Sequence, residues 1–394
     1  MKPLAVRDFT LVTALGQGRM PHLAALQTGR TGLARQDFET ASVGTWLGVV
    51  DGVDQVQLPA ALAEHDCRNN RLADMGLRAD GFAHSVAQAR QRWGATRVGV
   101  FLGTSTAGIL QTEVAYRHRD ASTGALPASL AYATTHNTYS VAGYVRAALG
   151  LSGPAHVVST ACSSSAKVFA TAQRMIEAGW VDAAVVGGVD SLCMTTLYGF
   201  QCLELVSTDI CRPWDAQRAG LSLGEAAAFA LLERDTAQPA AWLLGAGESS
   251  DGHHMSSPHP EGAGAALAMR YALAQAGLQP QDVDYLNLHG TGTPGNDAAE
   301  DKAVGSVYGT QLPCSSTKGY TGHTLGAAGA VEAAVAMLAL QHGFMPAGLN
   351  VQSVDPQLQS NYLLHNRQQT LKVVASNSFG FGGSNASLLF GAAA

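Results

Sequence analysis

Two patterns of hydrophobic and polar positions alternate along this chain. Short runs such as 97–102, 183–186 and 229–232 are mostly apolar at successive positions, which is typical of strands buried on both faces. The longer stretch 166–176 is apolar at roughly i, i+3 and i+4, the spacing of an amphipathic helix. The alternation of such runs with helical stretches predicts a layered α/β fold.

The pattern also predicts a division into two halves near residues 236–239. The strand-like run 229–232 precedes this segment, and a new strand-like run at 241–244 follows it. We therefore predict an N-terminal half over residues 1–239 and a C-terminal half over residues 240–394, although the sequence itself shows no visible repeat.

Composition agrees with a compact α/β enzyme. The 394 residues are enough for one large core or for two fused halves. Hydrophobic residues make up 46% and charged residues 14%, which excludes disorder, and the 44 glycines suit many tight strand-to-helix turns. The net charge of -6 and the lack of basic runs interleaved with aromatics argue against nucleic-acid binding.

No targeting or membrane-spanning segment is predicted. Residues 1–8 lack the apolar core of a signal peptide, and no stretch reaches the length of a membrane span without polar interruption. We therefore expect a cytoplasmic protein that makes no membrane contact.

Metal and disulfide sites are not expected either. The six cysteines form no C-x-x-C pair and no Cys/His spacing typical of zinc sites. His253, His254 and His259 lie in a loop rich in Ser, Pro and Gly, without the i, i+4 spacing of a helical metal site. We predict reduced thiols and no bound metal.

The most informative residue is Cys162. It follows the strand-like run 155–158 and precedes the helical stretch 166–176, which Gly179 ends. Because a helix N-terminus carries free N–H groups and partial positive charge, this position is expected to lower the thiol pKa toward neutrality. A single cysteine is more often a small buried hydrophobic residue, so its role as a nucleophile depends on other residues.

Two histidines supply that support. His289 opens the segment 289–294 after the strand-like run 283–288, and His323 lies in the glycine-rich segment 318–330. Each histidine alone fits a hydrogen-bonded turn as well as a catalytic role. Together with a cysteine in a reactive position, they indicate a nucleophilic active site.

Four motifs in order resemble β-ketoacyl-acyl-carrier-protein synthases of the elongating Cys-His-His type. They are TACSSS at 160–165, HGTGT at 289–293, KGYTGH at 318–323 and NSFGFGGSN at 377–385. The resemblance covers essentially the whole chain. It implies a thiolase-like five-layer α-β-α-β-α fold of two topologically similar halves, usually a dimer, with the cysteine from the first half and both histidines from the second.

The chemistry follows from the residue types. A thiolate at Cys162 accepts an acyl group from a thioester, and the backbone N–H of Cys162 is one donor to the oxyanion. Loss of carbon dioxide from a malonyl thioester yields an enolate, which two neutral imidazoles at His289 and His323 can stabilise. We predict a decarboxylative Claisen condensation of an acyl primer on Cys162 with malonyl-acyl carrier protein.

The resemblance implies further roles near these residues. Phe381 would supply the second oxyanion N–H, and Phe379 and Phe381 would gate the acyl pocket. Lys318 is placed with the catalytic group beside His323, and it sets charge and orientation there or transfers a proton. Glu332 would support Lys318 as its acidic partner.

The carrier protein is the expected partner. Thr291 and Thr293 would bind its phosphopantetheine arm, which carries the substrate, and no other cofactor is expected. Arg68 and Arg71 resemble basic positions that meet the acidic carrier protein.

One segment departs from the family pattern. Residues 218–228 carry Ala219, Ala226 and Ala228 where an acid and two glycines are usual, and the extra methyl groups could narrow whatever the backbone lines there. This puts the standard fatty-acid substrate in doubt. Residues 190–193 and 211–215 look closer to synthases of specialised pathways such as aryl polyene assembly. A heterodimer with a chain-length-factor-like subunit is therefore as consistent with the sequence as a homodimer.

Three alternatives remain. A degradative thiolase needs a second catalytic cysteine near the C-terminus, but no cysteine follows Cys314. A Cys-His hydrolase would not account for two histidines and a lysine. A non-catalytic chain-length-factor-like subunit would be expected to lack Cys162.

Overall fold

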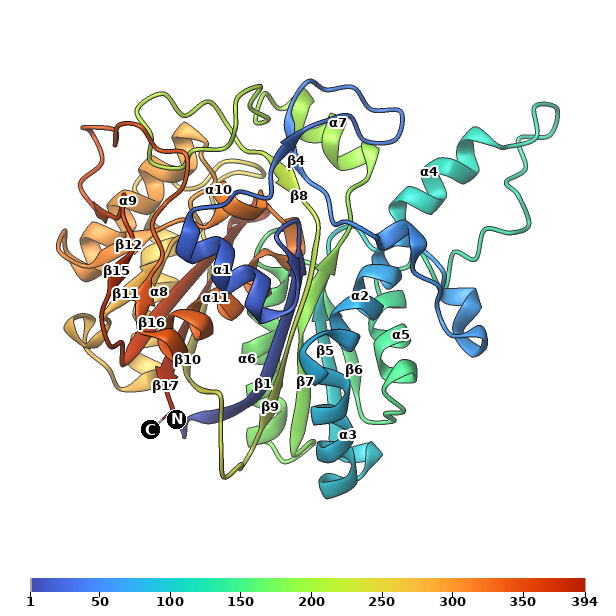
Figure 1. The fold of residues 1–394 in the computed structure, drawn as a ribbon, viewed down its shortest axis with the longest axis horizontal. Coiled ribbons are helices and arrows are strands. Elements are labelled where there is room, and N and C mark those ends of the chain that lie inside the picture. The colour runs from blue at the N-terminus through green and yellow to red at the C-terminus, as the bar shows by residue number, and fades with distance from the viewer. Residues whose placement is uncertain (1, 394) are drawn as a thin grey trace.

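A twelve-stranded sheet forms the framework of the computed structural model, which describes residues 2–393 (Figure 1). In spatial order its strands are β14 (Asn361–Tyr362), β12 (Pro313–Ser315), β11 (Tyr285–Asn287), β16 (Val373–Gly380), β17 (Ser384–Ala392), β10 (Ala241–Ser250), β1 (Leu4–Thr13), β9 (Ala226–Glu233), β7 (Ala183–Asp190), β5 (Val98–Gly103) and β6 (Ala155–Val158), with β2 (Gly16–Gln17) paired to β1. Two small sheets join β3 (Ala34–Arg35), β4 (Trp46–Gly48) and β8 (Leu223–Gly224), and β13 (Phe344–Met345) with β15 (Arg367–Gln368).

The α-helices lie on both faces of this framework. They are α1 (Arg19–Thr28), α2 (Arg68–Arg78), α3 (Phe82–Trp93), α4 (Ile109–Arg117), α5 (Ser140–Ala148), α6 (Ser164–Glu177), α7 (Met194–Cys202), α8 (Ala263–Ala276), α9 (Pro294–Tyr308), α10 (Lys318–Thr321) and α11 (Ala328–His342).

The two halves of the large sheet have the same topology. With five strands of each half numbered in chain order, β1, β5, β6, β7 and β9 lie in the order 3-2-4-5-1, and so do β10, β11, β12, β16 and β17. The halves meet where β1 pairs antiparallel with β10, Leu4 opposite Leu243. This internal symmetry, which no sequence repeat revealed, confirms the predicted fold of two similar halves.

The layers follow from where apolar side chains gather. Helices α6 and α11 pack between the two half-sheets in one large core, while α2, α3 and α5 cover the outer face of the first half and α8 and α9 that of the second. Helix α11 is buried on all sides over most of its length, and its many alanines let it fit between two sheets. The result is the predicted α-β-α-β-α arrangement.

The observed elements match most of the predicted ones. Strand β6 has the predicted bounds, and α6 begins at Ser164, two residues earlier than the predicted helical stretch. Strand β11 covers only Tyr285–Asn287 of the predicted run 283–288. The division at residue 239 stays a prediction; it falls in the connection between β9 and β10.

One segment of the described chain is long and apolar enough to cross a membrane. It is Leu325–His342, which includes α11, and 89% of it is buried inside the protein. Its apolar character is accounted for by its place in the central layer, between the two half-sheets.

Parallel strands bring the chemical motifs to one edge. Strand β5 is parallel to β6 and β7, and β11 is parallel to β12 and β16. The turns after β6, β11 and β12 therefore lie at carboxyl ends of strands, where α/β proteins place their sites. These turns carry Cys162, His289 and the segment 318–323.

Candidate active site

Cys162 lies in a tight turn between β6 and α6. Ala161 before it has a φ of 52°, which is unusual for a residue with a side chain, and the Ser164 hydroxyl donates to the Ala161 carbonyl at 2.5 Å. Ser164 Oγ also accepts from the N–H of Thr160 at 2.9 Å. These bonds fix the turn, so the Cys162 side chain is held at the N-terminal end of α6.

Burial corrects the expectation that the Cys162 thiol titrates near neutrality. Desolvation raises the pKa of Cys162 to about 12, although the positive charge of Lys318 acts to lower it. The position before a helix is therefore not enough to maintain a free thiolate at neutral pH. A reaction at this sulfur would require the thiol proton to leave as the new bond forms.

Alkylation of Cys162 tests this assignment. Because only the thiolate reacts and its pKa is raised, we expect the iodoacetamide rate to climb steadily with pH and to show no plateau up to pH ~9, above the ordinary thiol pKa of about 8.5. Peptide mass spectrometry of quenched samples measures the rate at residue 162, with exposed Cys202 as the internal control. A plateau near neutral pH would contradict the assignment.

His289 is held by Glu300, a residue that sequence analysis missed. The two carboxylate oxygens of Glu300 accept the backbone N–H groups of His289 at 2.8 Å and Gly290 at 2.7 Å, and Asn377 donates to the same carboxylate at 3.2 Å. Burial raises the pKa of Glu300 to about 7. The only sequence signal for it was an acidic residue in the helix that follows the HGTGT motif.

Lys318 makes its hydrogen bonds to His289 rather than to His323, although its charge also acts on His323, beside which it was expected. Its ammonium donates to the His289 carbonyl and to Glu332, and lies 3.3 Å from His289 Nδ1. Glu332 is thus its ion-pair partner, as the resemblance implied. Because an ammonium only donates, His289 Nδ1 must be the acceptor and the ring proton is placed on Nε2.

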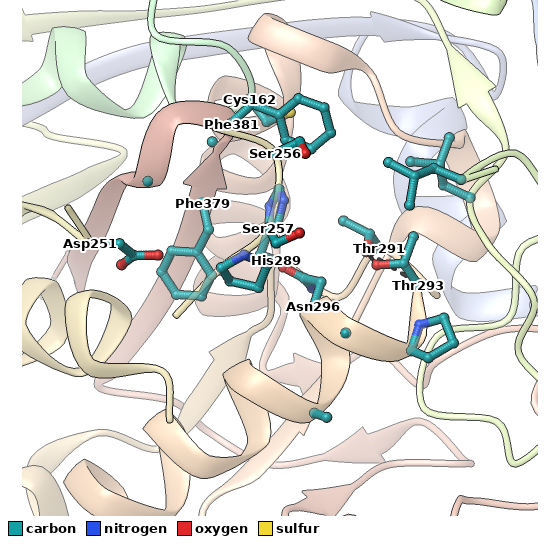
Figure 2. A pocket seen from close by; sticks show the side chains of 18 of the residues that line it. Cys162, Asp251, Ser256, Ser257, His289, Thr291, Thr293, Asn296, Phe379 and Phe381 are labelled. Atoms are coloured by element: carbon teal, nitrogen blue, oxygen red, sulfur yellow. Dashed lines mark hydrogen bonds between the residues drawn. The ribbon is translucent and has the colours of Figure 1, made fainter. Parts of the chain in front are cut away.

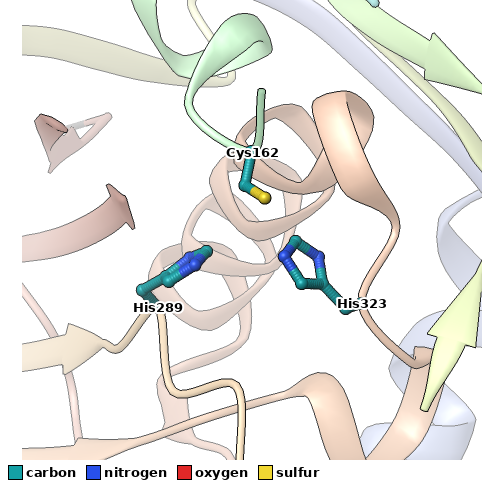
Figure 3. Close-up of side chains that lie close together, drawn as sticks. All are labelled: Cys162, His289 and His323. Carbon is teal, nitrogen blue, oxygen red and sulfur yellow. The ribbon is translucent and has the colours of Figure 1, made fainter. Parts of the chain in front are cut away.

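His323 is fixed in the same tautomer by a different donor. The backbone N–H of Leu325 donates to His323 Nδ1 at 3.2 Å, so this nitrogen carries no proton and Nε2 does. Figure 3 shows the two imidazoles converging on the Cys162 sulfur. One nitrogen from each ring and the sulfur lie within 4.8 Å of one another.

This tautomer pattern suits hydrogen-bond donation rather than metal binding. A cysteine and two histidines are chemically able to bind a metal such as zinc. A metal on Nε2 of His323 would require the ring proton to move to Nδ1, where the Leu325 N–H already points. Both rings therefore carry their proton on Nε2, where it is available for hydrogen-bond donation.

Both imidazoles stay neutral because they are buried. Desolvation, together with the nearby charge of Lys318, lowers the pKa of His289 and of His323 well below the ordinary value. Burial raises the pKa of Glu332 to about 7, so acidification leaves the Lys318 charge uncompensated and disfavours imidazolium further.

We therefore expect the condensation step to tolerate mild acid. The rate at which malonyl-acyl carrier protein discharges the acyl-enzyme is expected not to fall around pH ~6.5, the ordinary imidazole pKa. We expect this rate to decline only at lower pH. Stopped-flow or quench measurements from pH ~5.5 to ~8 check this. Because the pKa values of Glu300 and Glu332 are also raised to about 7, an acid limb near ~6.5 would contradict the assignment if it is accompanied by imidazolium signals of His289 or His323 in protein with ¹⁵N-labelled histidine.

A cavity of about 480 Å³ leads from these residues to the surface (Figure 2). Thr291 and Thr293 line it, with their hydroxyls 2.8 Å apart. Phe379 packs against His289, and Phe381 packs against Phe200 of α7, another lining residue that sequence analysis missed.

The Phe-Gly-Phe loop packs directly on the Cys162 turn. A Cβ at Gly380 would lie 2.5 Å from the Thr160 carbonyl and 3.2 Å from the Ser163 N–H, so only glycine fits. This close approach brings the backbone of Phe381 to the side of the cavity that holds the cysteine.

The structure overturns the predicted docking role of Arg68. Its side chain is buried and donates to both oxygens of Glu225, at 2.8 and 2.6 Å, so it is not available to a carrier protein. Arg71 is partly exposed and pairs with Asp66. Its docking role stays a prediction.

The alanines of segment 218–228 do not narrow the cavity. Ala226 and Ala228 lie in β9 and belong to the core around α6 and α11. None of the three alanines, Ala219 included, is among the residues that line the cavity. They therefore give no physical reason for an altered substrate.

Taken together, the fold and the site define a class of enzyme. A two-half thiolase-like fold with a buried cysteine beside two imidazoles is typical of acyltransferases. Comparison with known proteins gives the family. Residues 68–238 match the N-terminal domain and residues 240–352 the C-terminal domain of beta-ketoacyl synthase. The chain belongs to the β-ketoacyl synthase family.

Three relatives illustrate the likeness. The chain is 41% identical over 269 residues to the mitochondrial 3-oxoacyl-[acyl-carrier-protein] synthase of Arabidopsis thaliana, covering 63% of this chain and 58% of that one. It is 32% identical to 3-oxoacyl-[acyl-carrier-protein] synthase 2 of Vibrio cholerae over 93% of each. A ketosynthase from Xenorhabdus doucetiae, solved in complex with its chain length factor, superposes with a TM-score of 0.88 at 36% identity, over 100% of this chain and 98% of that one.

These comparisons confirm the predicted family, the thiolase-like fold and the enzyme class. The chain is an acyltransferase of the ketosynthase type. The individual roles of its site residues stay predictions.

Proposed function

We propose that this chain extends acyl groups by two carbons, with the growing chain held on Cys162 and malonyl-acyl carrier protein as extender. The observation that carries this proposal is the convergence of Cys162 with two imidazoles whose Nδ1 atoms each face a donor. That arrangement supplies a nucleophile and two N–H donors in one buried place.

In the first step the acyl group moves to the protein. Cys162 attacks the thioester carbonyl of the acyl carrier protein, the bond to the carrier sulfur breaks, and the thiol proton passes to that departing sulfur. One thioester replaces another, so the step is reversible. The N–H groups of Cys162 and Phe381 hold the oxyanion, which the packing of Gly380 on the Cys162 turn supports.

In the second step a carbon-carbon bond forms. The malonyl carboxylate leaves as carbon dioxide, and its bonding electrons form an enolate whose oxygen accepts hydrogen bonds from His289 and His323. The enolate carbon attacks the acyl carbonyl on Cys162, the carbon-sulfur bond breaks, and the sulfur takes a proton from solvent. Lys318 and Glu332 act as positioning residues for His289.

The polar part of the cavity fits the phosphopantetheine arm. The hydroxyls of Thr291 and Thr293 lie on the path from the surface to Cys162 and can pair with the amide groups of the arm (Figure 2). We propose that this arm, carried by the acyl carrier protein, is the only cofactor-like group the site takes.

A subunit partner is also proposed. Strand β6 lies at one end of the large sheet and is paired only to β5 within residues 2–393. Beside it, α4 and the loop after it project from the body of the protein (Figure 1), and Tyr116, Tyr132 and Tyr139 are exposed there. An unpaired strand edge next to exposed aromatics suits a subunit interface.

The occupant is a second copy or a chain-length-factor-like subunit. The Xenorhabdus relative was solved with a chain length factor, and this supports the heterodimer. All six cysteines are free, which suits the reducing cytoplasm as the location.

The function is tested with purified protein and a panel of acyl-carrier-protein thioesters. We expect an acyl adduct by intact-protein mass spectrometry, and its conversion to β-ketoacyl carrier protein when malonyl-acyl carrier protein is added. Release of free acid instead would favour a hydrolase. No adduct, alone or with an added chain-length-factor-like subunit, would contradict the proposal.

A further inference from the structure

Asp190 at the end of β7 is a buried carboxylate in contact with both halves of the protein. It is fully buried, and all of its recorded partners are N–H or O–H donors. They are the hydroxyls of Thr104, Ser105 and Thr106, the backbone N–H groups of Ser105 and Thr106, and the backbone N–H of Gly326.

The bond to Gly326 is the one that reaches the catalytic group. Asp190 Oδ2 accepts the Gly326 N–H at 2.5 Å, and the preceding residue, Leu325, donates its own N–H to His323 Nδ1. Two consecutive backbone N–H groups thus donate to different partners: that of Leu325 to the His323 imidazole, and that of Gly326 to the Asp190 carboxylate. Displacement of one N–H would reorient the other.

The backbone at this point needs an anchor. Leu325 has a φ of 53°, a left-handed conformation that is strained for a residue with a side chain. It opens the three-residue 3-10 turn Leu325–Ala327, which leads directly into α11, so the left-handed residue lies ahead of the first regular turn of that helix. The carboxylate of Asp190 is the charged group that ties this turn to the first half of the protein.

We infer that Asp190 is a positioning residue for His323: through Gly326 it holds the Leu325 N–H on Nδ1, which keeps the ring proton on Nε2 for donation to the enolate. The inference rests on the proposed role of His323 in decarboxylation. Asp190 does not touch the substrate, and its effect is confined to the second step.

Gly326 packs closely against the carboxylate of Asp190. A Cβ at Gly326 would lie 2.7 Å from Asp190 Oδ2 and 2.9 Å from the Ser105 N–H. Glycine is therefore required for the turn to reach the carboxylate. Gly326→Ala should push the turn away while Asp190 itself remains.

Asp190→Asn gives the sharpest test. Oδ1 accepts four hydrogen bonds, from Thr104, Ser105 and Thr106, and Oδ2 accepts three, from Ser105 and Gly326. The amide oxygen of the variant is therefore expected at the Oδ1 position, which places the amide nitrogen against the Gly326 N–H and breaks that bond.

Asp301→Asn is the matched control. Asp301 is buried, and within residues 2–393 its two oxygens accept the N–H groups of Gln359 and Ser360 and the Ser360 hydroxyl, none of which bonds to Cys162, His289 or His323. Its replacement loses the same kind of bonds without reaching His323.

Three readouts separate positioning from general stability. For Asp190→Asn and Gly326→Ala we expect the chase of acyl-Cys162 by malonyl-acyl carrier protein to slow by about 10²-fold, the scale of one lost oxyanion donor, while acylation of Cys162 changes by less than about 3-fold. Spectra of protein with ¹⁵N-labelled histidine should show His323 losing its pure Nε2–H signature. Asp301→Asn should change none of these.

The outcomes distinguish this inference from the proposed function. If wild-type protein fails to condense, the proposed function fails. If wild-type protein condenses but Asp190→Asn slows both steps equally, or leaves the His323 tautomer unchanged, the inference about Asp190 is overturned. Should Asp190→Asn not fold, Gly326→Ala decides by the same two criteria.

Discussion

Cys162→Ala is expected to form no acyl-enzyme from any acyl-carrier-protein thioester and to reduce condensation by about 10⁶-fold, the scale seen when a catalytic nucleophile is removed. The reason is that the acyl group would have no other residue to attach to where the two imidazoles converge. Since His289 and His323 remain, slow release of carbon dioxide from malonyl-acyl carrier protein should continue without product. Intact-protein mass spectrometry and labelled carbon dioxide measure the two effects.

The other cysteines of the chain provide the control for this variant. Cys211 is also buried, near the Thr291 carbonyl, so Cys211→Ala probes a neighbouring sulfur that is not in the catalytic group. Loss of the adduct in Cys211→Ala, or retention of condensation in Cys162→Ala, would defeat the assignment of the nucleophile.

His323→Asn is expected to show the opposite behaviour, with acylation of Cys162 retained and condensation reduced by about 10²- to 10³-fold. The asparagine oxygen can still accept the Leu325 N–H in place of Nδ1, but the shorter side chain lacks the Nε2–H that reaches the enolate oxygen. His289→Asn should behave similarly, because its ring is the other donor. Adduct mass and the rate of carbon dioxide release measure the two steps separately.

His22→Asn is the matched control for the histidine variants. His22 is buried with both ring nitrogens bonded, to Thr13 and to the Gly18 carbonyl, and burial lowers its pKa to about 4. It lies in α1, outside the catalytic group. An equal loss in His22→Asn and His323→Asn would mean that the effect reflects general destabilisation of the fold.

Much of the fold and the catalytic group could be predicted from the sequence, because both depend on local patterns. Runs of apolar residues are enough to identify β5, β7 and β9, and the short motifs locate Cys162 and the two histidines. The internal symmetry of strand order was not visible, since it lies in hydrogen-bonded pairing between distant segments.

What sequence reasoning missed depends on burial and on long-range contacts. The motif placed Cys162 before a helix, but only the structure shows that desolvation outweighs the helix and raises the thiol pKa. The sequence predicts a surface cation at Arg68, but Arg68 is buried and pairs with Glu225, which lies 157 positions away in the sequence. Glu300 and Asp190 hold backbone N–H groups, and no side-chain motif reports such bonds.

The most direct test of the central claim is peptide-level mass spectrometry of acyl-enzyme in a single turnover, before and after malonyl-acyl carrier protein is added. The account predicts an acyl group on the peptide that contains Cys162, and its complete discharge with the formation of one equivalent of β-ketoacyl carrier protein. An acyl group on a different residue, or product formed while Cys162 stays acylated, would contradict it.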